Sequence, residues 1–205
     1  MKKVLLIVFL IGSLNCFSQS LEKGDKLFGG SFSFSVFNVN NGNPVYYTGA
    51  NVGVLPSYSW IIRKDLALGI RGAVSYNRTV NKQTATGKRI STALAIGPSV
   101  FLKKYRSIKE KFGIYFDHDA GFVYSRNSDK TGPTSFESKS AGISYKFSPG
   151  VFYRFSNRFI GEGNIGGMYT SYFYGDSDNN AFGIGASFLQ YFNLGINYVI
   201  RKNKS

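Results

Sequence analysis

Residues 52–76 read VGVLPSYSWIIRKDLALGIRGAVSY, two alternating runs joined by the short polar turn Arg63-Lys64-Asp65. In each run, large apolar residues take every second position, and mainly small or polar residues stand between them. A period of two is that of a β-strand with two different faces. Two such runs on either side of a short polar turn indicate an antiparallel hairpin.

The same alternation recurs along the rest of the chain. Aromatic residues make up 17% of the sequence and glycine contributes 24 residues, a composition typical of all-β proteins. The seventh segment is weaker and rich in glycine, but eight segments can be counted. We therefore predict eight antiparallel strands, at residues 28–36, 51–62, 66–77, 90–102, 112–125, 141–155, 159–173 and 181–200.

The chemistry of the two faces predicts the environment of this sheet. A soluble barrel buries its apolar face and presents a charged one to water. Here the second face is mostly Gly, Ser, Ala and Asn, which suits a narrow lumen, and the apolar face of all eight segments carries no Lys, Arg, Asp or Glu. A basic residue on a lipid face at mid-bilayer costs about 2–4 kcal/mol. We predict an eight-stranded antiparallel transmembrane up-and-down β-barrel with its large apolar residues facing lipid.

The connections agree with that topology. Short turns at 63–65 and 156–158 alternate with longer polar connections at 38–48, 78–88, 126–138 and 175–180. In outer-membrane barrels, short turns face the periplasm and long loops face outside. The connection at 103–111 is basic and longer than the other turns. An aromatic girdle is predicted near the turn end, from Tyr58, Trp60, Phe112, Tyr153, Phe155 and Phe159.

The first 18 residues are typical of a secretory signal peptide. Lys2 and Lys3 form a basic region, and an apolar stretch runs from Val4 to Leu14. Cleavage after Ser18 leaves residues 19–205 as the barrel domain. A lipoprotein signal at Cys16 is the alternative, but Asn15 stands where a small residue is expected.

A family resemblance rests on residues 55–60 and 65–69, LPSYSW and DLALG. These resemble the outer-membrane β-barrel domain family common in Bacteroidota, akin to OmpA/OmpX-type barrels. The C-terminal region also resembles the signal read by the barrel assembly machinery, a polar residue followed by glycine and two spaced apolar residues. The resemblance implies a location in the bacterial outer membrane and contacts with its lipids and lipopolysaccharide, but no single activity. The residues that match the assembly signal are Asn193, Gly195, Tyr198 and Ile200.

Ionisable residues on the small-residue face are the strongest chemical lead. If segments 112–125 and 141–155 pair, Lys146 lies close to Asp117 or Asp119, and Arg154 lies diagonal to Glu162 across the turn. Buried charges are normally paired, so we interpret the set as an ion-pair network that fills the lumen. A gated proton or ion path is the alternative. The six residues are Arg71, Asp117, Asp119, Lys146, Arg154 and Glu162.

The run Asp117-His118-Asp119 makes a barrel-embedded hydrolase worth testing. A hydrolase needs a nucleophile or activated water oriented by a base. His118 is the only histidine, and alternation directs it to lipid, away from both aspartates. The outward His-x-Ser pairing of lipid A deacylases is missing, because Ala120 takes the place of the serine. We predict no enzymatic activity, no metal site and no cofactor.

The formal net charge of +14 raises the question of nucleic acid. Most of the positive residues fall in turns at the inferred periplasmic rim, where anionic headgroups are nearer partners. Nucleic acid is therefore not an expected partner. We predict a non-enzymatic membrane barrel that is structural or binds an unidentified surface ligand through its outer loops. A narrow porin-like channel is the alternative, although eight strands leave a lumen filled by side chains.

Overall fold

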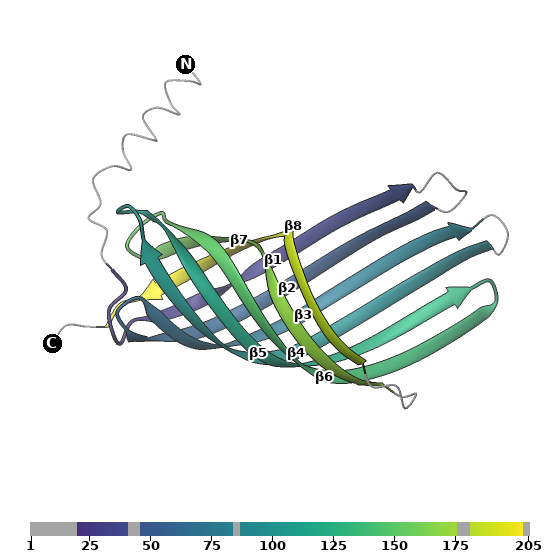
Figure 1. The fold of residues 1–205 in the computed structure, drawn as a ribbon. Coiled ribbons are helices and arrows are strands. Elements are labelled where there is room, and N and C mark those ends of the chain that lie inside the picture. The colour runs from purple at the N-terminus through teal and green to yellow at the C-terminus, as the bar shows by residue number, and fades with distance from the viewer. Residues whose placement is uncertain (1–19, 41–45, 84–86, 176–180, 203–205) are drawn as a thin grey trace, which may run out of the picture.

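The computed structural model describes residues 20–40, 46–83, 87–175 and 181–202. Eight strands form one closed barrel in chain order, each antiparallel to its neighbours (Figure 1). This confirms the predicted fold class. The signal peptide predicted at residues 1–18, Cys16 included, lies outside the described residues. The strands are β1 (Lys26–Asn40), β2 (Tyr46–Arg63), β3 (Leu66–Gln83), β4 (Gly87–Ser107), β5 (Phe112–Thr131), β6 (Thr134–Arg154), β7 (Phe159–Gly175) and β8 (Ala181–Ile200).

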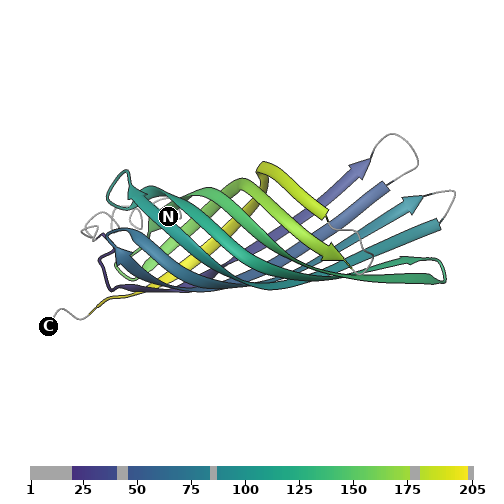
Figure 2. The same cartoon turned by 60° about the horizontal axis from the view of Figure 1, so that its bottom comes forward.

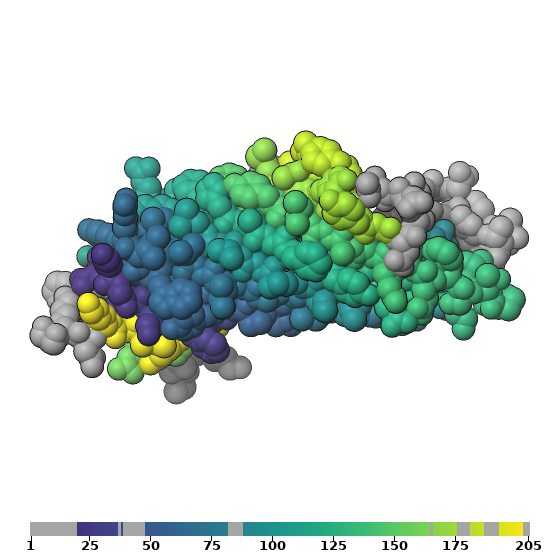
Figure 3. Space-filling model, turned by 90° about the horizontal axis from the view of Figure 1, so that it is seen from below, coloured from purple at the N-terminus to yellow at the C-terminus, as the bar shows by residue number. Residues whose placement is uncertain are grey.

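The barrel closes where β1 pairs with β8, from Lys26 opposite Ile200 to Ser33 opposite Asn193. Figure 3 shows the start and the end of the described chain together at one end of the molecule. All four residues that resemble an assembly signal lie in this closing seam. Their partners on β1 are Ser33 for Asn193, Ser31 for Gly195, Phe28 for Tyr198 and Lys26 for Ile200.

The outer wall of the barrel is apolar. Side chains such as Phe28 and Ile143 are 60% and 62% exposed, whereas their neighbours along the strand point into the lumen. No described helix is long and apolar enough to cross a membrane. Five of the six aromatic residues predicted for the turn end take part in edge or tilted ring pairs. These pairs are Tyr58 with Trp60, Tyr153 with Phe155, and Phe159 with Tyr198.

Several predicted loops are strand instead. β3 continues to Gln83 and β4 begins at Gly87, so the polar connection predicted at 78–88 is mostly paired backbone. The connection predicted at 126–138 is likewise a hairpin, with Thr131 opposite Thr134. Figures 1 and 2 show the β1–β2, β3–β4 and β5–β6 hairpins projecting well beyond the β7–β8 hairpin. Alternation fails as a signal here because most residues on both faces of these strand ends are polar.

The turn end of the lumen holds an apolar core rather than the small and polar residues that we predicted. Tyr105 and Phe152 are 2% and 1% exposed, and their rings meet edge to face at 5.3 Å between centroids. Glycine at position 150 makes room for this packing, since a Cβ there would lie 2.2 Å from Cζ of Tyr115. The core consists of Leu21, Leu27, Ile61, Ala67, Tyr105, Tyr115, Phe152, Ile160 and Val199.

The segment before β1 closes this end of the barrel. Leu21 is fully buried in the core, and its backbone N–H donates to Oδ1 of Asp65 at 3.2 Å, while the Asp65 N–H donates to the Leu21 carbonyl at 3.1 Å. Arg201, just after β8, donates to Asp25 Oδ2 at 2.6 Å and to the Ser20 carbonyl at 3.1 Å. The two ends of the described chain therefore hold each other across the barrel mouth.

We expect Arg201→Gln to loosen residues 20–25 by about 1–2 kcal/mol, because it removes a charge-assisted hydrogen bond to Asp25 at a partly exposed site. Amide hydrogen exchange of that segment, measured on the folded barrel in detergent, should accelerate accordingly. Lys202→Gln is the control, since Lys202 reaches Asp25 through its backbone N–H. Equal exchange in both variants would show that Arg201 does not hold the segment.

Candidate functional site

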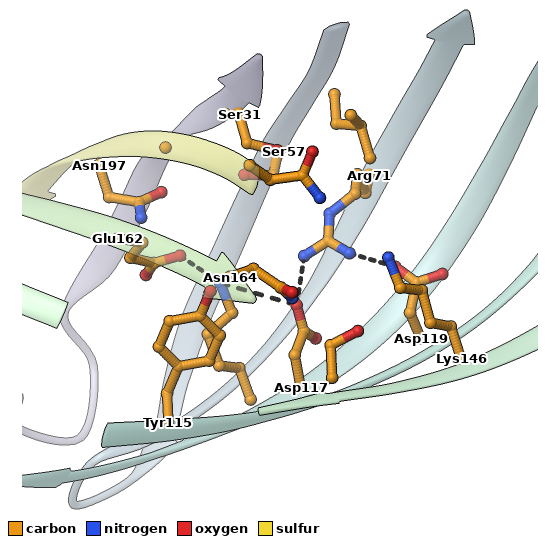
Figure 4. Close-up of a pocket in the computed structure, with 16 residues that line it drawn as sticks. Ser31, Ser57, Arg71, Tyr115, Asp117, Asp119, Lys146, Glu162, Asn164 and Asn197 are labelled. Carbon is orange, nitrogen blue, oxygen red and sulfur yellow. Dashed lines mark hydrogen bonds and ion pairs between the residues drawn. The ribbon is translucent and has the colours of Figure 1, made fainter. Parts of the chain in front are cut away.

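The candidate site is a chain of charged side chains inside the lumen, above the apolar core. Arg71 comes from β3, Asp117 and Asp119 come from β5, and Glu162 comes from β7 (Figure 4). Lys103 comes from β4. Each of these residues occupies an inward position of its strand. Glu162 therefore meets the others across the lumen, although β7 is not a neighbour of β3, β4 or β5 in the barrel. We call these five residues the lumen network.

The upper part of the lumen network is organised by Arg71. Its guanidinium donates to Oδ2 of Asp117 at 2.8 Å and, through Nη1, to Asp119. Asp119 also accepts a hydrogen bond from the Ser99 hydroxyl at 3.1 Å. The Arg71 guanidinium lies over the Phe101 ring, 4.4 Å from its centroid. One planar cation thus holds two carboxylates apart in a fixed arrangement.

The lower part is organised by Glu162. Its carboxylate accepts from Lys103 Nζ at 2.6 Å and from the Tyr105 hydroxyl at 2.5 Å. Lys103 Nζ also lies 3.8 Å from Oδ2 of Asp117, which links the two parts. The Lys103 and Glu162 side chains are only 7% and 8% exposed. Both charges are therefore removed from bulk water and depend on each other for compensation.

The structure brings together four of the six charges named from sequence: Arg71, Asp117, Asp119 and Glu162. Lys146 lines the same cavity, and its Cα is the cross-strand partner of that of Asp119. Among the described residues, however, it has no hydrogen bond and no ion pair within 4.0 Å. Arg154 is diagonal to Glu162 in the register of β6 and β7, as expected, but its guanidinium is directed to a different carboxylate. Arg154 lies near the turn end with its guanidinium 3.6 Å from Oδ1 of Asp65.

Lys103 and Tyr105 are not among the residues predicted from the sequence, because the basic run at 103–111 resembles a turn. β4 in fact continues to Ser107. Residues 99, 101, 103 and 105 are alternate positions of β4 and share its inward face. Extending the alternation beyond Ser99 therefore identifies both residues. With Lys103 included, and with Lys146 beside them, the charges that share this cavity number three of each sign.

The lumen network leaves little open space. The cavity it lines measures about 50 Å³, which is room for a few water molecules. Below it the apolar core fills the barrel. This arrangement can hold the lumen closed and fix the relative positions of β3, β4, β5 and β7, whereas passage of a solute requires the ion pairs to separate.

The candidate hydrolase residues do not meet. His118 projects from the outer wall, where its Nδ1 lies 2.7 Å from the Tyr145 hydroxyl, while Asp117 and Asp119 point into the lumen. The barrel wall therefore separates the histidine from both carboxylates. In the described part of the chain, no group of three or more His, Cys, Asp or Glu side chains is arranged to hold a metal ion.

Comparison with known proteins gives a likeness of fold. No family model matches the chain, and no curated protein matches it. The outer membrane protein OprG from Pseudomonas aeruginosa is 12% identical with a TM-score of 0.46, over 88% of this chain and 98% of that one. A major outer membrane protein from Thermus thermophilus is 10% identical with a TM-score of 0.44, over 85% and 99%. The attachment invasion locus protein Ail of Yersinia pestis is 16% identical with a TM-score of 0.41, over 88% and 100%.

Proposed function

We propose that this chain is an integral β-barrel protein of the bacterial outer membrane, without enzymatic activity. The observation that carries the proposal is the exposed apolar wall. Phe32, Val54, Ile70 and Val100 are each about half exposed or more, on four successive strands. Such a surface is unfavourable in water but suits a bilayer, in which a closed barrel satisfies its backbone hydrogen bonds internally.

The closed lumen supports a role for the outer surface rather than for transport. Ions or solutes would have to pass the lumen network and then the apolar core around Tyr105, which are stacked one above the other. The three projecting hairpins remain available on the outer side. We therefore propose a structural protein or one that binds a surface ligand, with a narrow porin-like channel as the alternative.

Assembly and family remain part of the same proposal. The seam residues Asn193, Gly195, Tyr198 and Ile200 are the candidates for recognition by the barrel assembly machinery, since their strand closes the barrel. The resemblance of residues 55–60 and 65–69 to the Bacteroidota family supports the same location. Lipopolysaccharide and outer-membrane phospholipids are the expected surroundings.

Expression of the full chain in a bacterium with an outer membrane tests the proposal. We expect the protein in the outer-membrane fraction, with heat-dependent electrophoretic mobility and an N-terminus at Gln19. Purified protein in planar bilayers should show no steady conductance, because the lumen network blocks the barrel. A soluble periplasmic product would contradict the membrane assignment, and stable single-channel currents would favour the channel alternative.

A further inference from the structure

Basic side chains gather on the outer face of β3 to β6, directly above the apolar wall. Arg78 stands two positions beyond Tyr76 on β3, and Arg126 stands two positions beyond Tyr124 on β5. The cross-strand partner of Arg126 is Lys139 on β6. Alternate positions of a strand share a face, so these cations continue the outward faces of the two tyrosines. We call Arg78, Arg126 and Lys139 the outer basic cluster.

The charge of this surface is positive overall. All three cluster residues are exposed or half-buried, and Lys88 and Lys130 lie exposed further along the same hairpins. Glu137 is the acid beside the cluster, and it accepts a hydrogen bond from Arg126 at 2.7 Å. Asp129 lies on the inward face, paired with Arg89 at 2.8 Å, and does not offset the cluster.

Two apolar hollows lie in the lipid-facing wall below the outer basic cluster. The first measures about 660 Å³ and has a floor of small or rigid residues, Pro56, Gly72, Pro98 and Ala120. The second measures about 460 Å³ and lies against Ile143 and Tyr172. The two hollows share Ala120 and Gly121, so they adjoin on β5.

The hollows lie about half a bilayer thickness below the outer basic cluster. Ala120 lies six residues below Arg126 on the same face of β5, which is about 20 Å along a strand. A tilt of about 45° reduces this to about 14 Å of depth, close to half of the roughly 25 Å apolar band of such barrels. The hollows therefore lie near mid-bilayer when the outer basic cluster lies at the outer interface.

We propose that this face binds a phosphorylated, multiply acylated glycolipid of the lipid A class, an inference that rests on the proposed outer-membrane location. The phosphates contact the outer basic cluster and the acyl chains occupy the two hollows. The cluster spans β3 to β6, three strand spacings or about 14 Å. A disaccharide with a phosphate at either end fits this spread better than a phospholipid with one phosphate, and two adjoining hollows suit a lipid with several chains.

Native mass spectrometry of the full barrel, titrated in detergent with defined lipids, tests this proposal. The probes are lipid A, lipid A stripped of its phosphates, and phosphatidylglycerol. We expect lipid A to bind most tightly. The double variant Arg126→Gln with Lys139→Gln should lower the affinity for lipid A about tenfold or more, because it removes two cations that attract the phosphates. Ala120→Phe, which fills the shared floor, should also weaken lipid A with the basic residues intact.

The matched control is Lys64→Gln with Arg106→Gln, which removes two exposed charges at the opposite rim and should leave lipid A binding unchanged. Heat-dependent mobility checks that every variant is folded. Equal affinity for lipid A and phosphatidylglycerol, or equal loss in the control, would overturn the glycolipid site. A wild-type chain that inserts normally without preferring lipid A refutes this inference alone, whereas a chain that never inserts refutes the proposed function.

Discussion

Lys103→Met is expected to destabilise the folded barrel by about 3–5 kcal/mol, because it leaves the Glu162 carboxylate buried without its cation. Glu162 is held 2.6 Å from Lys103 Nζ, and both side chains are shielded from bulk water. The Tyr105 hydroxyl still donates to Glu162, but a neutral donor does not compensate a buried charge. Urea unfolding in detergent, followed by the fluorescence of Trp60, the single tryptophan, measures the loss.

The double variant Lys103→Met with Glu162→Gln separates pairing from packing. It removes both charges and keeps an oxygen that can accept from Tyr105, so it should be more stable than Lys103→Met alone. Lys146→Met should have a smaller effect, since the structure gives Lys146 no ion pair within 4.0 Å among the described residues. If the double variant lost as much as the sum of the single ones, Lys103 and Glu162 would not be coupled.

The outer wall could be predicted from the sequence because lipid imposes one rule on every strand. An outward position must be apolar, so residues such as Ile70 and Val100 recur at every second position of the strands, whatever the inward residues are. The strand ends follow a weaker rule. Most residues on both faces of the outer strand ends are polar, and the paired residues at 78–83 and 87–88 therefore look like a loop in sequence.

The lumen could be predicted only in part, for a geometric reason. Sequence alternation predicts contacts between side chains on neighbouring strands, as in an open sheet. In a narrow barrel, inward side chains also meet across the lumen, so Lys103 on β4 finds Glu162 on β7, and Arg71 on β3 finds Asp117 on β5. Sequence identified most of the charges, but their pairing depends on the stagger of all eight strands.

The apolar core at the turn end could not be predicted from the sequence, for a related reason. Near the turn, inward residues such as Ile61 and outward ones such as Trp60 are both large and apolar, so alternation no longer distinguishes the faces. Leu21 stood outside any predicted strand. Its burial depends on contacts with Asp65 and on the position of Arg201, which lie far from it in sequence.

Val100→Arg tests whether the outer wall crosses a bilayer. Val100 is 53% exposed on β4, with Ile70 and Ala120 as its cross-strand partners, at the depth of the hollows. A charge there should cost about 2–4 kcal/mol, because arginine at mid-bilayer must be drawn into hydrocarbon. We expect a marked fall in folding yield into lipid vesicles and a lower urea midpoint for the fraction that folds.

Thr92→Arg is the control for depth. Thr92 shares the outward face of β4 with Val100 but lies eight residues away toward the outer end of the strand, opposite Arg78. Near the outer interface the same substitution should cost only about 0–1 kcal/mol, since the guanidinium reaches water and headgroups. The difference in folding yield between the two variants therefore measures the effect of the bilayer, separately from the effect of adding an arginine to the outer wall. Equal folding yields for both would mean that this face of β4 does not lie in lipid, and the location proposed for the protein would have to be abandoned.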